Sequence, residues 1–179
     1  MGLKVRRKKS FSGYTRFSWS EAVKSATIGS EDIMQRVVVA NDHGAVELAQ
    51  ILIAHLKERG FAVNHLGVTT ADSVDYPDMA AAACAEYRTG GYAFGVLLCG
   101  TGIGISISAN KIDGIRCALP QNRYAAAMAR RHNDVNFIAF GGRIDYPEDP
   151  VSMLDAFIDA TFEGGRHQRR VDKIMALQS

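Results

Sequence analysis

The sequence predicts a three-layer α/β domain in which helices flank a five-stranded parallel sheet on both faces. Short apolar runs alternate with segments of helical periodicity over most of the chain, which is typical of parallel sheets. The chain has 179 residues, of which 47% are apolar and 22% charged, as expected for one globular core. No apolar run reaches the roughly 18 residues of a membrane-spanning helix, so we expect no membrane partner.

Five apolar runs are predicted to be strands, and helical segments follow them in turn. The predicted strands cover residues 37–40, 61–66, 94–98, 115–119 and 136–140. The predicted helices cover 45–59, 77–88, a segment in which Ile105, Ile107 and Ala109 pack on the sheet, 122–131, 149–162 and a short C-terminal stretch. Gly60 suits the C-cap of the first helix and Pro77 the first turn of the second. Residues 34–179 therefore form the predicted domain.

Residues 1–33 are predicted to be a basic extension outside this domain. They hold seven Lys or Arg against three acidic residues and lack the apolar segment of a secretory signal. A transit peptide and a nucleic-acid-binding arm are the less favoured alternatives. The remaining residues carry a small net negative charge, so we expect no nucleic-acid partner for the domain. The three cysteines form no CxxC pair, which predicts reduced thiols in a cytoplasmic protein without a zinc site.

The third strand leads into a glycine-rich loop, Cys99-Gly-Thr-Gly-Ile-Gly104, and then into a helix. Such a loop directs backbone N–H groups and the positive end of the helix dipole toward one point, which favours an anion. We expect Cys99 and Thr101 at the lip of this anion site. Other polar residues follow neighbouring strands: Asp42, His43 and Arg143. Because ligands bind at the carboxyl ends of parallel strands, these segments are predicted to converge on one active site.

Three other chemistries fit the loop less well. A dinucleotide fingerprint and a cysteine-phosphatase loop would need glycine and arginine, respectively, where the chain has Ile105. A hydrolase using Cys99, His132 and Asn133 is conceivable, but Asn133 directly follows the histidine and is poorly placed to orient it.

Motifs along the chain resemble the type B ribose-5-phosphate isomerases, a family that includes galactose-6-phosphate isomerase subunits. The motifs are Asp42-His-Gly44, Asp75-Tyr-Pro77, Cys99-Gly-Thr-Gly-Ile-Gly-Ile-Ser106, Asn110-Lys111, Gly114-Ile-Arg116, His132-Asn-Asp-Val-Asn136, Ala139-Phe-Gly-Gly-Arg143 and Glu163-Gly-Gly-Arg-His-Gln-Arg-Arg170. The resemblance implies a Rossmann-like fold and an aldose–ketose isomerisation through an enediolate, with no metal or cofactor. Ribose 5-phosphate and ribulose 5-phosphate are the leading substrates. Tetrose 4-phosphates and allose or galactose 6-phosphate are alternatives. A non-enzymatic sugar-phosphate-binding module is less favoured, because it gives no reason for a thiol and a hydroxyl beside the anion site.

The resemblance also implies roles for the loop residues. Cys99 would be the base that moves a proton between C1 and C2, and a helix N-terminus favours the thiolate that this role requires. Thr101 and the N–H groups of Gly100, Gly102 and Gly104 would hold the negative charge of the enediolate.

The remaining implied roles concern ring opening and phosphate binding. His132 would open the sugar ring, with Asn133 beside it and Asp42 near the ring oxygen. The residues implied in binding the rest of the substrate are Arg143, Arg166, Arg170 and His43 at the phosphate and Tyr76 along the sugar. Arginine suits phosphate because its planar fork donates two hydrogen bonds. The family shares active sites across a homodimer or dimer of dimers, which would let His132 or the arginines serve the partner's site.

Overall fold

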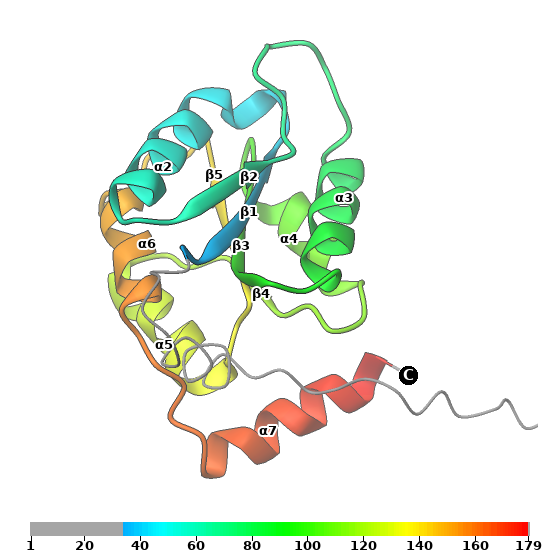
Figure 1. Cartoon of the computed structure of the whole chain (residues 1–179), viewed down its shortest axis with the longest axis vertical. Helices are drawn as coiled ribbons and strands as arrows, with labels where there is room; N and C mark the ends of the chain where they lie inside the picture. Colours follow the sequence, from blue (N-terminus) through cyan, green and yellow to red (C-terminus); the bar gives the residue numbers. More distant parts are fainter. Residues whose placement is uncertain (1–33, 179) are drawn as a thin grey trace, which may run out of the picture.

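Five parallel strands form the middle layer of the protein, with helices on both faces (Figure 1). This computed structural model describes residues 34–178, so the predicted extension at 1–33 lies outside the described residues. The strands are β1 (Arg36–Asn41), β2 (Ala62–His65), β3 (Tyr92–Cys99), β4 (Cys117–Ala118) and β5 (Phe137–Gly141). They lie in the order β2-β1-β3-β5-β4, and each neighbouring pair is parallel. The predicted α/β class and the number of strands in this sheet are confirmed.

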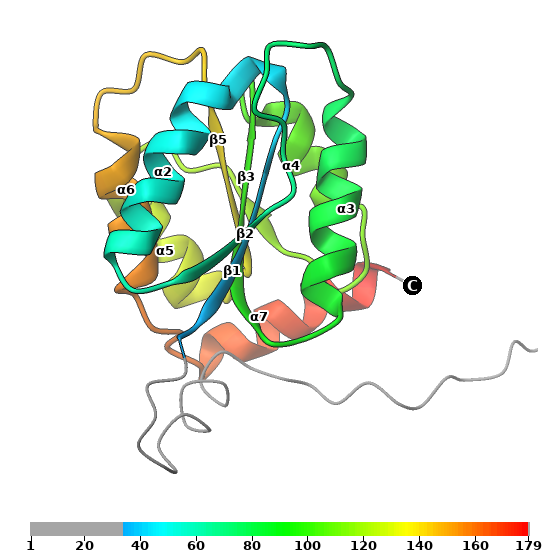
Figure 2. The ribbon, with the colours of Figure 1, turned by 45° about the horizontal axis from the view of Figure 1, so that its top comes forward.

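The helices divide into two layers and one outlying element. Their bounds are η1 (His43–Ala45), α2 (Val46–Glu58), α3 (Tyr76–Arg88), α4 (Ile103–Asn110), α5 (Arg123–Asn133), α6 (Pro150–Ile158), α7 (Arg166–Met175) and η2 (Ala176–Gln178). Buried side chains of α2, α5 and α6 form one core cluster with the sheet, and those of α3 and α4 form the other. Figure 2 shows α7 lying across the end of the sheet opposite to the start of α4. Among the described helices, none combines the length and apolar character needed to cross a membrane.

Two predicted elements are shorter in the structure than in the sequence analysis. The strand expected at 115–119 contains only Cys117 and Ala118. Before it, the Asn136 side chain takes the place of a neighbouring strand: it accepts from the Arg116 N–H and donates to the Gly114 carbonyl, both at 2.8 Å. The helix expected to reach residue 162 ends at Ile158. Beyond it, the Glu163 N–H donates to the Arg131 carbonyl of α5 at 3.0 Å, which replaces a further bond within α6.

The predicted packing of the helix after the glycine loop was partly wrong. Ile105 and Ala109 are fully buried, but Ile107 is 55% exposed. An i, i+4 pair shares one face of a helix, whereas the residue midway between them points elsewhere. Ile103 is also i, i+4 to Ile107 and is 54% exposed, so α4 carries an apolar pair on its outer face.

Arg130 is a buried cation on the inner face of α5, with 1% of its surface exposed. Its guanidinium lies over the Phe157 ring at 4.6 Å, donates to the Val135 carbonyl and lies 3.7 Å from the Asp134 carboxylate. Burial lowers the pKa of Arg130 to about 10, and the attraction of Asp134 opposes this shift. The side chain therefore ties α5 both to α6 and to the segment that enters β5.

We expect Arg130→Ala to lower the free energy of unfolding by about 3–5 kcal/mol, because it leaves a partly buried carboxylate without one of its cations. Urea unfolding followed by circular dichroism measures this change. Arg131→Ala removes the neighbouring exposed arginine and should cost less than about 0.5 kcal/mol. Equal losses in the two variants would contradict a structural role for the buried guanidinium.

Candidate active site

The ends of β1, β3 and β5 are joined by backbone hydrogen bonds at the carboxyl edge of the sheet. Asp42 N–H donates to the Leu98 carbonyl at 3.0 Å, and Gly142 N–H donates to the Cys99 carbonyl at 2.9 Å. Arg143 N–H donates to the Gly100 carbonyl, also at 2.9 Å. The structure thus brings together three chain segments that the sequence places more than 40 residues apart.

Gly102 allows the glycine loop to sit against the end of β5. It has a φ of 76°, a conformation that other residues adopt at a steric cost. A Cβ atom there would lie 2.6 Å from Leu119 Cδ1 and 2.9 Å from the Phe140 carbonyl carbon. The loop can therefore approach the strand this closely only with glycine at position 102.

The Cys99 thiol lies beneath the glycine loop and not at its lip as predicted. The residue is 3% exposed, and its Sγ accepts a hydrogen bond from the Gly102 N–H at 3.2 Å. Thr101 is exposed, and its Oγ1 accepts from the Ile103 N–H at 3.3 Å. The N–H of Gly102, expected to face a ligand, thus points at the sulfur. A ligand at this site would contact Thr101 before it reached the sulfur.

Asp42 and His43 occupy the turn that follows β1. Asp42 is buried, and its carboxylate accepts from the Gly44 N–H at 2.8 Å as the N-cap of η1. The His43 Nδ1 accepts from the Val74 N–H at 3.2 Å. Since Nδ1 is an acceptor, the neutral ring carries its hydrogen on Nε2, which can donate to an anion.

Tyr76 and Arg143 both lie against the glycine loop, at Gly104 and at Gly100 respectively. A Cβ atom on Gly104 would lie 2.6 Å from the Tyr76 ring, so the ring rests directly on the first turn of α4. A Cβ atom on Gly100 would lie 3.7 Å from Arg143 Cδ, which places the exposed arginine beside the loop backbone. The carboxyl edge therefore offers a thiol, a hydroxyl, a histidine, a tyrosine and an arginine around one glycine loop.

The other predicted site residues lie at the opposite edge of the sheet. His132 and Asn133 end α5 just before β5 begins, and Arg166 and Arg170 are exposed on α7 (Figure 2). β5 runs from Phe137 to Gly141, which is paired with Cys99, and this span alone covers roughly 13 Å. Within one chain, His132 therefore cannot reach a substrate bound at Cys99.

His132 belongs to a cluster with two residues to which the sequence analysis gave no role. Its ring stacks on the His167 ring at 4.2 Å with an angle of 8°, and its Nε2 lies 3.6 Å from Glu163 Oε2. One ligand atom from each of the three residues lies within 4.8 Å of the others. A metal ion must lie in the plane of each imidazole that binds it, and nearly parallel stacked rings do not provide this. Glu163 and His167 stand in the Glu163–Arg170 motif, which was the available sequence signal.

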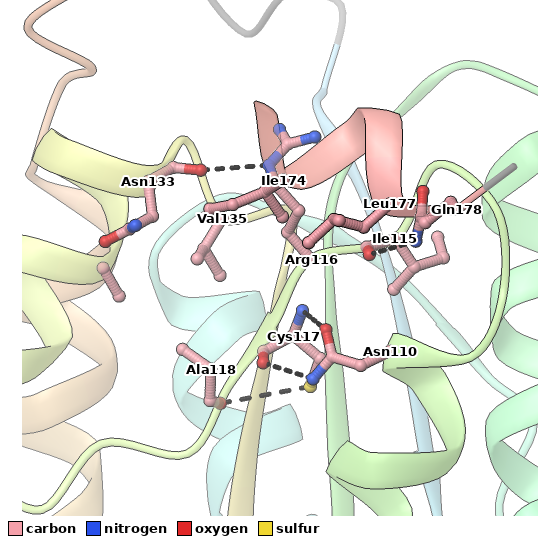
Figure 3. A pocket seen from close by; sticks show the side chains of 11 residues that line it. Asn110, Ile115, Arg116, Cys117, Ala118, Asn133, Val135, Ile174, Leu177 and Gln178 are labelled. Carbon is pink, nitrogen blue, oxygen red and sulfur yellow. Dashed lines mark hydrogen bonds between the residues drawn. The ribbon is translucent and has the colours of Figure 1, made fainter. Parts of the chain in front are cut away.

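A pocket of about 460 Å³ opens beside β4, away from the glycine loop (Figure 3). Figure 3 shows Asn110 bonded to Cys117 and Arg116 directed toward Asn133. The Arg116 guanidinium is engaged by the carbonyls of Asn133 and Asp134. Burial raises the pKa of Cys117, so its thiol stays protonated at neutral pH. The pocket lacks both an available base and an uncommitted cation among its described lining residues.

The chain matches known proteins over nearly all of its described residues. The profile of the Ribose/Galactose Isomerase family matches residues 37–174. Ribose-5-phosphate isomerase B of Escherichia coli is 40% identical over 145 residues, which cover 81% of this chain and 97% of that protein. D-erythrulose-4-phosphate isomerase of Pectobacterium atrosepticum is 36% identical over 142 residues, covering 79% and 93%.

A solved structure agrees with these sequence matches. Ribose-5-phosphate isomerase B of Clostridium thermocellum superposes with a TM-score of 0.77 at 39% identity, covering 80% of this chain and 97% of that one. The glycine loop and the segments that contain His132 and His167 fall inside the matched region, residues 37–174. The chain therefore belongs to the ribose/galactose isomerase family.

Proposed function

We propose that the protein interconverts ribose 5-phosphate and ribulose 5-phosphate in the cytoplasm, without a metal or cofactor. The observation that carries the proposal is the Cys99 sulfur, which receives the Gly102 N–H at the carboxyl edge, where polar groups from β1, β3 and β5 meet. Relatives that share about 40% of the sequence are named ribose-5-phosphate isomerase B. Free cysteines, such as the three described here, remain reduced in the cytoplasm.

The Cys99 thiolate would remove the C2 proton from the open-chain aldose. The electrons of the C–H bond then form an enediolate with its charge on O1. Transfer of the C2 hydroxyl proton to O1 and return of a proton to C1 yield the ketose. Thr101 and the loop N–H groups would hold the oxygen that carries negative charge, a contribution that commonly amounts to a hundredfold or more in rate. The aldose is mostly a closed ring, so His132 would first move the proton of the anomeric hydroxyl to the departing ring oxygen.

A second copy of the chain would complete the site. The thiol and the ring-opening histidine lie at opposite edges of one sheet, so the partner must supply one of them. The exposed pair Ile103 and Ile107 on α4 lies next to the glycine loop and gives an apolar surface for this contact. In the homodimer, His132, Asn133 and the α7 arginines of one protomer would face the loop of the other. Arg166 and Arg170 would then bind the phosphate together with Arg143 and His43.

Another sugar phosphate is the second candidate substrate. The Pectobacterium relative is named for a tetrose phosphate and is nearly as similar to this chain as the Escherichia coli relative. Allose and galactose 6-phosphate would need one more carbon of pocket length than the pentose. The Cys99 chemistry is the same for all of these substrates because the proton always moves between C1 and C2.

The test is to incubate the wild-type protein with ribose 5-phosphate in deuterated water. We expect deuterium at C1 of the ketose formed and, after reversal, at C2 of recovered aldose, both measured by NMR. Four-, five- and six-carbon aldose phosphates assayed in parallel identify the preferred substrate. Binding of these compounds without exchange in any of them would favour the non-enzymatic binding module.

A further inference from the structure

We infer that Glu163 is a positioning residue for His132, holding its imidazole in the orientation needed to open the sugar ring. The inference rests on the proposed function and concerns a carboxylate to which neither the motif nor the mechanism above gives a role. Glu163 lies in the linker between α6 and α7, and its Oε2 is 3.6 Å from His132 Nε2. The same oxygen is 3.7 Å from His167 Nε2, so one carboxylate faces both rings.

The linker is held against α5 independently of the Glu163 side chain. The Glu163 N–H donates to the carbonyl of Arg131, the residue before His132, at 3.0 Å. Gly164 and Gly165 then take φ angles of 63° and 53°, which turn the chain back so that His167 reaches the His132 ring. The backbone thus places residue 163 beside the His132 ring, and a substitution of the Glu163 side chain leaves this backbone contact in place.

The His167 ring stacks on the His132 ring and does not compete with it for the anomeric proton. It is 5% exposed, and its Nε2 lies 3.2 Å from the Arg166 Nε, which can only donate. The accepting nitrogen indicates a neutral ring, and burial, reinforced by His132 and Arg166, lowers the pKa of His167. His167 is therefore the neutral ring of the stacked pair, and the Glu163 carboxylate is left to face His132.

The arrangement suits a proton shuttle. While the anomeric proton is in transit to the ring oxygen, His132 is an imidazolium, and a carboxylate beside it stabilises that charge and fixes the ring plane. The Glu163 side chain is 48% exposed in the single chain, so the same carboxylate is placed where the proposed partner's substrate would approach. Glu163 acts through His132 and needs no contact with the sugar.

The inference is tested by comparing two reactions in Glu163→Gln. Ribulose 5-phosphate cannot close a furanose ring because its C5 hydroxyl is phosphorylated, so deuterium wash-in at its C1 reports the Cys99 step without ring opening. We expect Glu163→Gln to lower kcat/KM for ribose 5-phosphate by about tenfold or more. General acid–base catalysis commonly contributes about 10²–10⁴-fold to a rate, and a positioning residue should account for part of that factor. Wash-in at C1 of ribulose 5-phosphate should stay within about twofold of wild type.

Two further variants make the comparison specific. Glu163→Asp keeps the charge and should recover part of the lost turnover, whereas Glu58→Gln makes the same charge change on an exposed position of α2 and should change neither reaction. Equal losses of turnover and wash-in in Glu163→Gln, or no loss in either, would overturn the inference. Absence of wash-in in the wild-type protein would instead show that the proposed function itself fails.

Discussion

Cys99→Ala is expected to lower the rate of isomerisation by about 10²–10⁴-fold, the usual worth of a positioned acid–base group. The methyl group left behind cannot accept the C2 proton, and nothing else described at the carboxyl edge replaces the sulfur that Gly102 N–H stabilises. Sugar-phosphate binding should persist, because the arginines and His43 are unchanged. Deuterium wash-in measures the first effect and calorimetric titration with ribose 5-phosphate the second.

Cys84→Ala is the matched control. Cys84 is fully buried in α3, and burial raises the pKa of its thiol to about 12, so it holds its proton at neutral pH. This variant should keep wild-type wash-in even if it is somewhat less stable. Wash-in that survives in Cys99→Ala would remove the thiol from the mechanism and leave Asp42, in the turn after β1, as a carboxylate to test as the base.

Mixing two inactive variants is expected to restore about a quarter of the wild-type activity. Each shared site would take Cys99 from one protomer and His132 from the other in a two-fold dimer. In a mixed dimer of Cys99→Ala and His132→Asn, one site carries both changes and the other carries neither. Random reassociation makes about half of the dimers mixed, so about one site in four is intact. The measurement is isomerase activity after the two proteins are unfolded and refolded together.

A second mixture tests whether the recovery is specific. Cys99→Ala and Thr101→Val both alter the carboxyl edge, so every site in their mixed dimer contains one of the two changes. This pair should show no recovery beyond the activity of the separate variants. Recovery in both mixtures, or in neither, would contradict a site composed of opposite sheet edges from two chains.

The fold was largely predictable from the sequence, because apolar runs and helical periodicity record burial directly. Strand order was not, since each strand sequence is equally compatible with several neighbours. The shortened β4 and α6 depend on two distant contacts, from Asn136 to Arg116 and from Glu163 to Arg131, that no local pattern reveals. Periodicity also failed at Ile107, where alternation along the sequence was mistaken for one helical face.

The sequence predicted which chain segments meet at the carboxyl edge of the sheet, but not how they are arranged there. The glycine loop and the residues after β1 and β5 were identifiable because parallel strands end at one edge. The depth of Cys99 depends on the turn at Gly102, which places the sulfur under the backbone. Glu163 and His167 come close to His132 only because α7 folds back onto α5. The stacked residues, His132 and His167, are 35 positions apart in the sequence.

The side chain of Asn110 also occupies the outer margin of the sheet at β4. The outer strand of a sheet normally presents unpaired N–H and C=O groups on which another chain can add a strand. At β4, the Asn110 amide occupies both backbone groups of Cys117 and acts as a terminal partner for the strand. That margin of the sheet is therefore closed to strand addition at Cys117, and β2 is the outer strand on the opposite side of the sheet.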